Sequence, residues 1–188
     1  MGILDKCYTP NTENQHNYLL DSCVFDKRLS NSGDDVNLLI EATKQGYEFY
    51  VTELQSREIH GVPDRKRTYN VKWEQPENAA RIEEIFELLN VKRVSCYGNP
   101  CQAWLVVLDG TYRAIESSDS DEPRVQMFYE IYNDNTRHLN DAVIAESAIY
   151  NGCTFISTDK RVIRIVNKYF QNRAIHYDDF IREVQVLR

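Results

Sequence analysis

The sequence predicts an α/β protein in which a parallel sheet carries helices on both faces. Short apolar segments of strand length alternate with amphipathic helical segments along the whole chain, which is typical of a parallel sheet. Apolar residues make up 42% of the 188 residues and charged residues 27%, a composition that excludes a disordered or fibrous protein. A chain of this length can bury one well-packed core, so we expect a single domain.

Short apolar runs bounded by polar residues mark the predicted strands. They cover 18–20, 49–51, 91–94, 153–158 and 174–176. Apolar residues at helical spacing mark the helices between them. Helices are predicted from Asp34-Asp35, as the cap, to Gly46, from Pro76 to Asn90, from Pro123 through Ile131, from Asp141 to Tyr150 and from about Val162 to Phe170. Gly152 supplies the left-handed cap after one of these helices.

The remaining segments define the expected domain organisation. We expect a flexible tail over 1–17 and one domain over 18–188, with insertions around 61–78 and 99–124. Within the second insertion, residues 99–117 keep helical spacing, although Asp109-Gly110 would also fit a hairpin turn. No apolar run approaches the roughly 20 residues that a membrane span needs, and no signal peptide is visible. A soluble cytoplasmic protein is expected.

Charge and cysteine content limit the class of function. The formal net charge is −7, the wrong sign for a protein that binds nucleic acid over its whole surface, although a local basic patch or a bound cation can reverse the local field. The five cysteines are scattered without a CxxC pair. They therefore indicate reduced, mostly buried thiols instead of a disulfide framework or a zinc site.

Acidic residues follow three of the predicted strands. Asp21, Glu53 and Asp159 each come at the end of an apolar run. In open α/β sheets, ligands bind beyond the carboxyl ends of the strands, so these acids should face one crevice. Asp141 adds a fourth acid if the start of its helix lies at the same end. For each acid taken alone, a helix cap or a solvated loop carboxylate is the alternative.

Clustered carboxylates predict a cation. Two carboxylates about 4 Å apart repel each other by about 4 kcal/mol at an effective dielectric constant of 20. A metal-free cluster would therefore hold protons or spread apart, and a divalent cation removes the conflict at neutral pH. Oxygen ligands without Cys or His at ligand spacing favour Mg²⁺ or Mn²⁺ over zinc, and no calcium-loop motif is present.

Four segments resemble, in order and spacing, the successive motifs of PIN-domain nucleases. They are Leu19–Phe25, Val51–Leu54, Leu139–Ala145 with Ala148, and Phe155–Asp159. The resemblance covers about residues 17–180. It implies a three-layer α/β/α sandwich with a central, mainly parallel sheet.

The resemblance also implies an activity and its site. PIN-domain members are Mg²⁺- or Mn²⁺-dependent endoribonucleases, many bacterial ones are toxins held in check by an antitoxin, and dimerisation is common in such families. Carried over by position, the catalytic and metal-binding quartet is Asp21, Glu53, Asp141 and Asp159. Ser22 and Thr158 stand where the family often has small hydroxyl residues beside the acids.

Basic residues could contact the phosphates of an RNA substrate. The candidates are Arg65, Lys66, Arg67, Lys160 and Arg161. Such residues position a strand without reading its sequence, and a solvated charged face is the alternative for each group.

Two other classes of function stay open. One is an inactive member of the same fold that binds RNA or a protein. The other is a phosphohydrolase with Asp21 as nucleophile, which is disfavoured because Ser22-Cys23 follows in place of a second nearby Asp.

Overall fold

A parallel sheet forms the centre of the computed structural model, which describes residues 7–11, 16–60, 78–94, 96, 122–133 and 135–186. Over these ranges the sheet has six strands in the order β1-β4-β3-β2-β5-β6, and every pairing is parallel. The strands are β1 (Cys7–Tyr8), β2 (Asn17–Leu20), β3 (Glu48–Thr52), β4 (Lys92–Val94), β5 (Thr154–Ser157) and β6 (Ala174–His176). The predicted α/β class is therefore confirmed.

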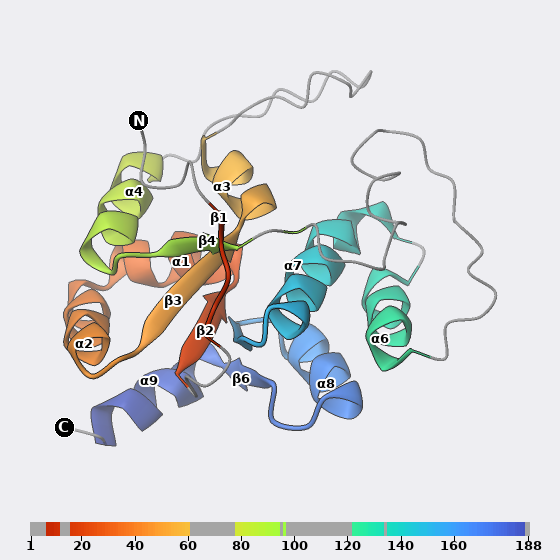
Figure 1. The fold of residues 1–188 in the computed structure, drawn as a ribbon. Coiled ribbons are helices and arrows are strands. Elements are labelled where there is room, and N and C mark those ends of the chain that lie inside the picture. The colour runs from red at the N-terminus through yellow and green to blue at the C-terminus, as the bar shows by residue number, and fades with distance from the viewer. Residues whose placement is uncertain are drawn as a thin grey trace.

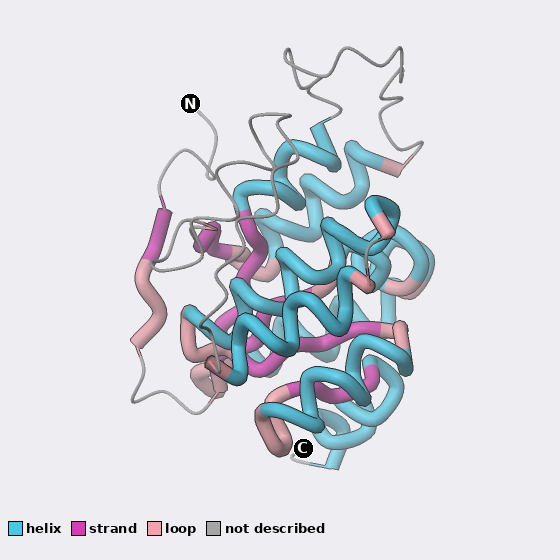
Figure 2. The backbone as a smooth tube through the Cα atoms, turned by 90° about the vertical axis from the view of Figure 1, so that its right-hand side faces the viewer, coloured by secondary structure: helices cyan, strands magenta, loops and turns pink. Residues whose placement is uncertain are grey.

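Helices cover both faces of this sheet. They are α1 (Ser22–Lys27), α2 (Gly33–Lys44), α3 (Glu53–His60), α4 (Ala79–Leu88), α6 (Pro123–Tyr132), α7 (Leu139–Tyr150), α8 (Lys160–Tyr169) and α9 (Tyr177–Val186), with the 3-10 turns η2 (Leu29–Asn31) and η3 (Thr136–His138). Helices α2, α4 and α9 lie on one side of the strands, and α6, α7 and α8 lie on the other (Figure 1). Figure 2, viewed from the side of α6, α7 and α8, shows helices in front of the strands. The result is a three-layer α/β/α sandwich.

Successive side chains along the strands pack into two hydrophobic cores, one on each face of the sheet. Leu20 packs in the core beneath α2, α4 and α9, whereas Leu19 packs in the core beneath α6, α7 and α8. Ile156 and Phe155 divide in the same way on β5. Successive side chains of a strand point to opposite faces, so near-continuous apolar runs are what a sheet covered on both faces requires.

Helix starts differ in detail from those predicted. The cap of α2 is Ser32, whose Oγ accepts a hydrogen bond of 3.2 Å from the backbone N–H of Asp35, so Asp34 and Asp35 lie in the first turn. Helix α7 begins at Leu139, directly after η3, and Asp141 is therefore inside its first turn and is not its cap. The left-handed Gly152 after α7, with φ of 72°, is as predicted.

One strand and three α-helices were not predicted. Cys7–Tyr8 pair with β4 inside the expected N-terminal tail, and α1, α3 and α9 follow β2, β3 and β6. The buried side chains of α9 keep helical spacing, namely Tyr177, Phe180, Ile181 and Val184. Residues 61–77, which include Pro76, and 97–121 lie outside the described residues, so their expected insertions stay predictions. None of the described helices has the length and apolar character that crossing a bilayer requires.

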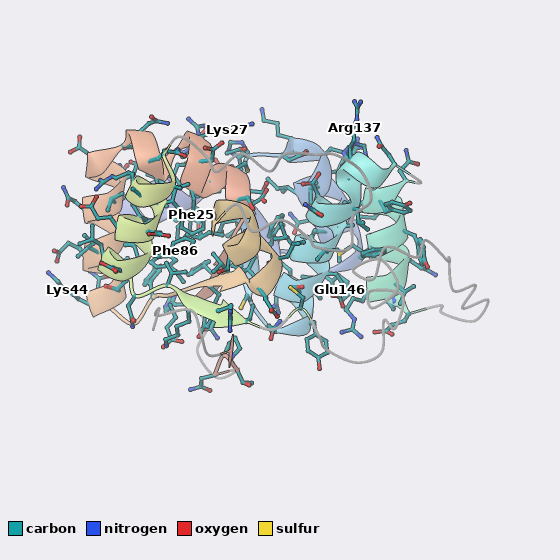
Figure 3. The ribbon with its side chains drawn as sticks, turned by 90° about the horizontal axis from the view of Figure 1, so that it is seen from above. Phe25, Lys27, Lys44, Phe86, Arg137 and Glu146 are labelled. Carbon is teal, nitrogen blue, oxygen red and sulfur yellow. The ribbon has the colours of Figure 1, made fainter. Side chains whose placement is uncertain are left out.

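An aromatic pair joins α1 to α4. Phe25 is fully buried and meets Phe86 edge to face, with ring centroids 4.7 Å apart and an interplanar angle of 79°. Figure 3 shows both side chains turned into the interior. Because α1 directly follows Asp21, this contact also supports the end of β2.

We expect Phe86→Ala to lower the free energy of unfolding by about 3–5 kcal/mol, because it leaves a cavity beside Phe25. Urea denaturation measures the loss. Leu88→Ala is the matched control, since Leu88 is 46% exposed on the same helix and its replacement should change stability by no more than about 0.5 kcal/mol. Equal effects of the two substitutions would contradict the packing described.

A buried acid lies between α6 and α7. Glu146 is 2% exposed, and its Oε1 is 3.3 Å from Nε of Arg124, which also binds Glu122 at 2.8 and 3.1 Å. Burial raises the pKa of Glu146 to about 7, Arg124 opposes the rise and Glu122 adds to it. The folded state therefore binds this proton more tightly than the unfolded chain does.

The stability of the protein should fall as pH rises from about 4.5 to 7, because the contribution of protonated Glu146 is complete below its unfolded pKa and is lost through its folded pKa. Glu146→Gln should remove this contribution and leave the variant more stable than the parent at pH 8 by at most about 3 kcal/mol. Thermal unfolding across this pH range tests the expectation. Glu84→Gln, at an exposed carboxylate paired with Arg81, should keep the parental pH profile.

Candidate functional site

The strand order places a topological switch at β2. The chain passes from β2 to its neighbour β3 on one side and later to β5 on the other. Crevices at such switch points, outside the carboxyl ends of the strands, are where open α/β sheets bind ligands. Asp21 directly follows β2, and Thr158-Asp159 directly follows β5.

The backbone at Asp21 is held from both sides. The Asp21 N–H donates to the carbonyl of Ile156 at 2.9 Å, which continues the pairing of β2 with β5. On the other side, the buried Gln55 donates from Nε2 to the carbonyl of Leu20 at 2.7 Å and accepts from the N–H of Thr52 at 2.9 Å. The position of Asp21 is thus fixed by β5 and by the start of α3.

The Asp21 carboxylate is a buried acid. It is 7% exposed, and its Oδ2 accepts hydrogen bonds from Ser157 Oγ at 2.6 Å and from Cys23 Sγ at 3.1 Å. Burial raises its pKa above the ordinary value, while these two hydrogen bonds act in the opposite direction. Among the described residues it forms no ion pair.

Asp159 is linked to Asp21 through the same hydroxyl group. Its backbone N–H donates to Ser157 Oγ at 3.0 Å. Its Oδ1 caps α8 by accepting from the N–H groups of Arg161 at 2.8 Å and of Val162 at 3.2 Å. The capping role that was the alternative for this acid is therefore real, and it leaves the second carboxylate oxygen outside the cap.

Asp141 approaches from the first turn of α7. Its pKa is raised to about 6, chiefly by burial and also by the negative charges of Asp21 and Asp159, while Arg161 opposes the rise. The Arg161 guanidinium lies 4.0 Å from Asp141 Oδ2 and donates to the carbonyl of Ile131 at 2.9 Å. Three acids that are far apart in the sequence are thus electrostatically coupled.

These three acids line one cleft of about 480 Å³. The predicted neighbours Ser22 and Thr158 line it as well. Sequence reasoning missed the remaining polar residues of the lining, which are Cys23, Asp26, Lys27, Arg137 and Asn140. Asp26 and Lys27 extend the Leu19–Phe25 motif by one and two residues, and this proximity is the one signal that could have indicated them.

Glu53 occupies a different position. It begins α3 directly after β3, as the strand-end reasoning predicts, but it is not among the residues that line the cleft. Its charge contributes to the raised pKa of Cys96, for which burial is the main cause. The predicted role of Glu53 as a ligand stays a prediction.

The predicted basic residues lie in different surroundings. Arg161 contacts Asp141, whereas its neighbour Lys160 lines a second hollow of about 400 Å³ together with Arg164 and His176. Arg65, Lys66 and Arg67 lie outside the described residues, so their substrate contact stays a prediction.

The donor set of the cleft suits a hard, hydrated cation. Over the described ranges, no three His, Cys, Asp or Glu residues stand close enough to hold one ion directly. Mg²⁺ usually keeps several waters and binds one or two carboxylates, which three spaced carboxylates can provide. Asp21, Asp141 and Asp159 would hold such an ion, because a bound cation would relieve the repulsion among their negative charges.

Comparison of the chain with protein-family models, with curated proteins and with solved structures gives no match. Parallel α/β sheets carry many unrelated activities, so function has to follow from the cleft itself.

Without a divalent ion, Asp141→Asn should stabilise the protein at pH 7.5. The folded pKa of Asp141 is raised to about 6, so its contribution is complete below pH 3.8 and is lost as pH rises through 6. Because the side chain is 39% exposed, solvent screening reduces the expected gain to about 1 kcal/mol.

Chemical denaturation in EDTA at pH 7.5 and at pH 3.5 measures this gain, which should vanish at the lower pH. Asp34→Asn is the matched control, because Asp34 is an exposed acid in the first turn of α2 and its loss should cost a few tenths of a kcal/mol. A similar loss for Asp141→Asn would show that Asp141 bears no electrostatic strain.

Proposed function

We propose that the protein is an Mg²⁺- or Mn²⁺-dependent endoribonuclease that hydrolyses phosphodiester bonds in the cleft of Asp21, Asp141 and Asp159. The observation that carries the proposal is the convergence of these carboxylates, at the ends of β2 and β5 and the start of α7, in a single cleft. Carboxylates that raise one another's pKa in a cleft are candidates for a functional site, and a divalent cation would relieve their repulsion.

The chain supplies position and charge to the reaction. When bound, a divalent ion polarises a phosphate oxygen and lowers the pKa of a water molecule. Ser157 holds the Asp21 carboxylate and the Asp159 backbone through one hydroxyl group, so the two acids keep a fixed relative position. Arg161 is anchored on the Ile131 carbonyl and lies beside Asp141, where it limits the negative charge that this acid adds.

The likeness of four sequence segments to PIN-domain nucleases supports the same activity. The fold class and the placement of Asp21, Asp141 and Asp159 are compatible with it. Toxin-type members of that family add an antitoxin partner, dimerisation and a cytoplasmic location to the proposal, and none of these rests on a feature of the cleft.

An inactive module that binds RNA or a protein is the second candidate. The position of Glu53 favours it, because the cleft then holds three of the four acids that the family uses. RNA cleavage with Mn²⁺, and its loss with EDTA, separates an enzyme from such a module.

Asp21→Asn and Asp159→Asn should each reduce Mn²⁺-dependent cleavage of single-stranded RNA by more than about 100-fold, beyond the usual cost of losing a residue that only orients a ligand. Both replacements keep an oxygen that can accept the hydrogen bonds from Ser157 or from the α8 N–H groups, so the fold should survive. Gel-based cleavage assays, with circular dichroism for folding, measure the two effects.

Asp34→Asn, on the exposed surface of α2, should cleave at the parental rate. If Asp21→Asn cleaves RNA at the parental rate when Mn²⁺ is saturating, the assignment of the cleft as the active site is refuted. Glu53→Gln tests whether Glu53 is the fourth acid of the site. A loss of cleavage comparable to that of Asp21→Asn would assign Glu53 a role in the reaction, and parental activity would exclude that role.

A further inference from the structure

Two cationic side chains line the acidic cleft from different parts of the chain. Lys27 is the last residue of α1, and Arg137 lies in η3, immediately before α7. In Figure 3 both side chains extend from the same side of the molecule, whereas Lys44 projects from another edge. The acids of the cleft are thus accompanied by one ammonium and one guanidinium group.

These two cations have no charged partner within the described part of the chain. Over the described ranges, neither the Lys27 ammonium nor the Arg137 guanidinium forms an ion pair or a hydrogen bond. Both residues are exposed. Several other described cations are paired, for example Lys44 with Glu41 at 2.7 Å and Lys92 with Glu48 at 2.6 Å, whereas Lys160 and Arg164 also lack an ion pair within the described residues.

The balance of charge limits what the cleft can accept. Asp21, Asp141 and Asp159 repel a phosphate group unless a cation lies among them, and Asp26 adds a further exposed acid to the lining. Phosphates beside the cleaved bond need positive charge of their own. Lys27 and Arg137 are suited to this, because both groups bind phosphate oxygens well.

The lining also indicates how a substrate would be recognised. Among the described residues that line the cleft, none is aromatic, and the apolar members are Ile82 and Ile144. Proteins that hold single strands by their bases do so by stacking them on aromatic rings. Contacts at this cleft would therefore be to the phosphate backbone, which carries no sequence information.

On the premise that the cleft is the nuclease site, we propose that Lys27 and Arg137 bind the phosphates flanking the cleaved bond of an RNA strand. The substrate class is then a polynucleotide that lies across the cleft between α1 and η3. The contacts of Lys27 and Arg137 to these phosphates would then be independent of the RNA sequence.

The test measures binding separately from cleavage. In the Asp21→Asn background, fluorescence anisotropy follows a labelled oligouridine of about twelve nucleotides, a length within the usual site size for single strands. Lys27→Ala and Arg137→Ala should each reduce the magnitude of the negative slope of log K against log salt by about 0.7, the value for one phosphate contact on a single strand. Lys44→Ala, at an exposed lysine away from the cleft, should leave the slope unchanged.

One further variant and a kinetic measurement test the same contacts. Lys27→Arg keeps the positive charge and should retain the parental slope, which separates loss of charge from loss of packing. With Asp21 restored, Lys27→Ala and Arg137→Ala should raise KM for the same RNA more than they lower kcat, because they remove contacts to phosphates that do not react.

The outcomes distinguish the two proposals. If the parent cleaves RNA while both alanine variants keep the slope of the Lys44→Ala control, the phosphate contacts are refuted and the nuclease stands. If both variants lower the slope but the parent cleaves no RNA with Mg²⁺ or Mn²⁺, the nuclease is refuted and the chain binds RNA at the cleft without cutting it.

Discussion

A single hydroxyl group connects the ends of the two strands on which the cleft depends. Ser157 donates to the Asp21 carboxylate and accepts from the Asp159 backbone, and it can do both because β2 and β5 pair with Leu20 opposite Ile156. A shift of this pairing by one residue would turn every side chain of a strand to the other face. The register is therefore as important to the site as the identity of the acids, and the two hydrophobic cores enforce it.

The cleft holds acidic groups whose charged forms are destabilised by the fold. Asp21 and Asp141 have raised pKa values because burial and neighbouring acids disfavour their charged forms. A site of this kind lowers the stability of the ligand-free protein, and the surrounding packing has to offset that cost. The nearly complete burial of the residues of β2, β3 and β5 on both faces of the sheet provides this packing.

The sequence predicted the layers of the fold and the approximate place of three acids, because strand length, helical spacing and the strand-end rule depend on local pattern. It could not predict the direction of a side chain after its strand has ended, and Glu53, which follows β3 directly, is not among the residues that line the cleft. It also missed Lys27 and Arg137, because a six-residue helix and a 3-10 turn have no periodic signature. Helix α9 did have such a signature, in Phe180 and its neighbours.

Gln55 gives the molecule a mechanical link between a helix and the cleft. Its amide joins the N–H of Thr52, at the end of β3, to the carbonyl of Leu20, which belongs to the peptide bond that leads into Asp21. The backbone that leads into Asp21 is therefore tied to β3 and to the first turn of α3, as well as to β5, so three elements of the sheet layer and its helices share the task of placing one carboxylate.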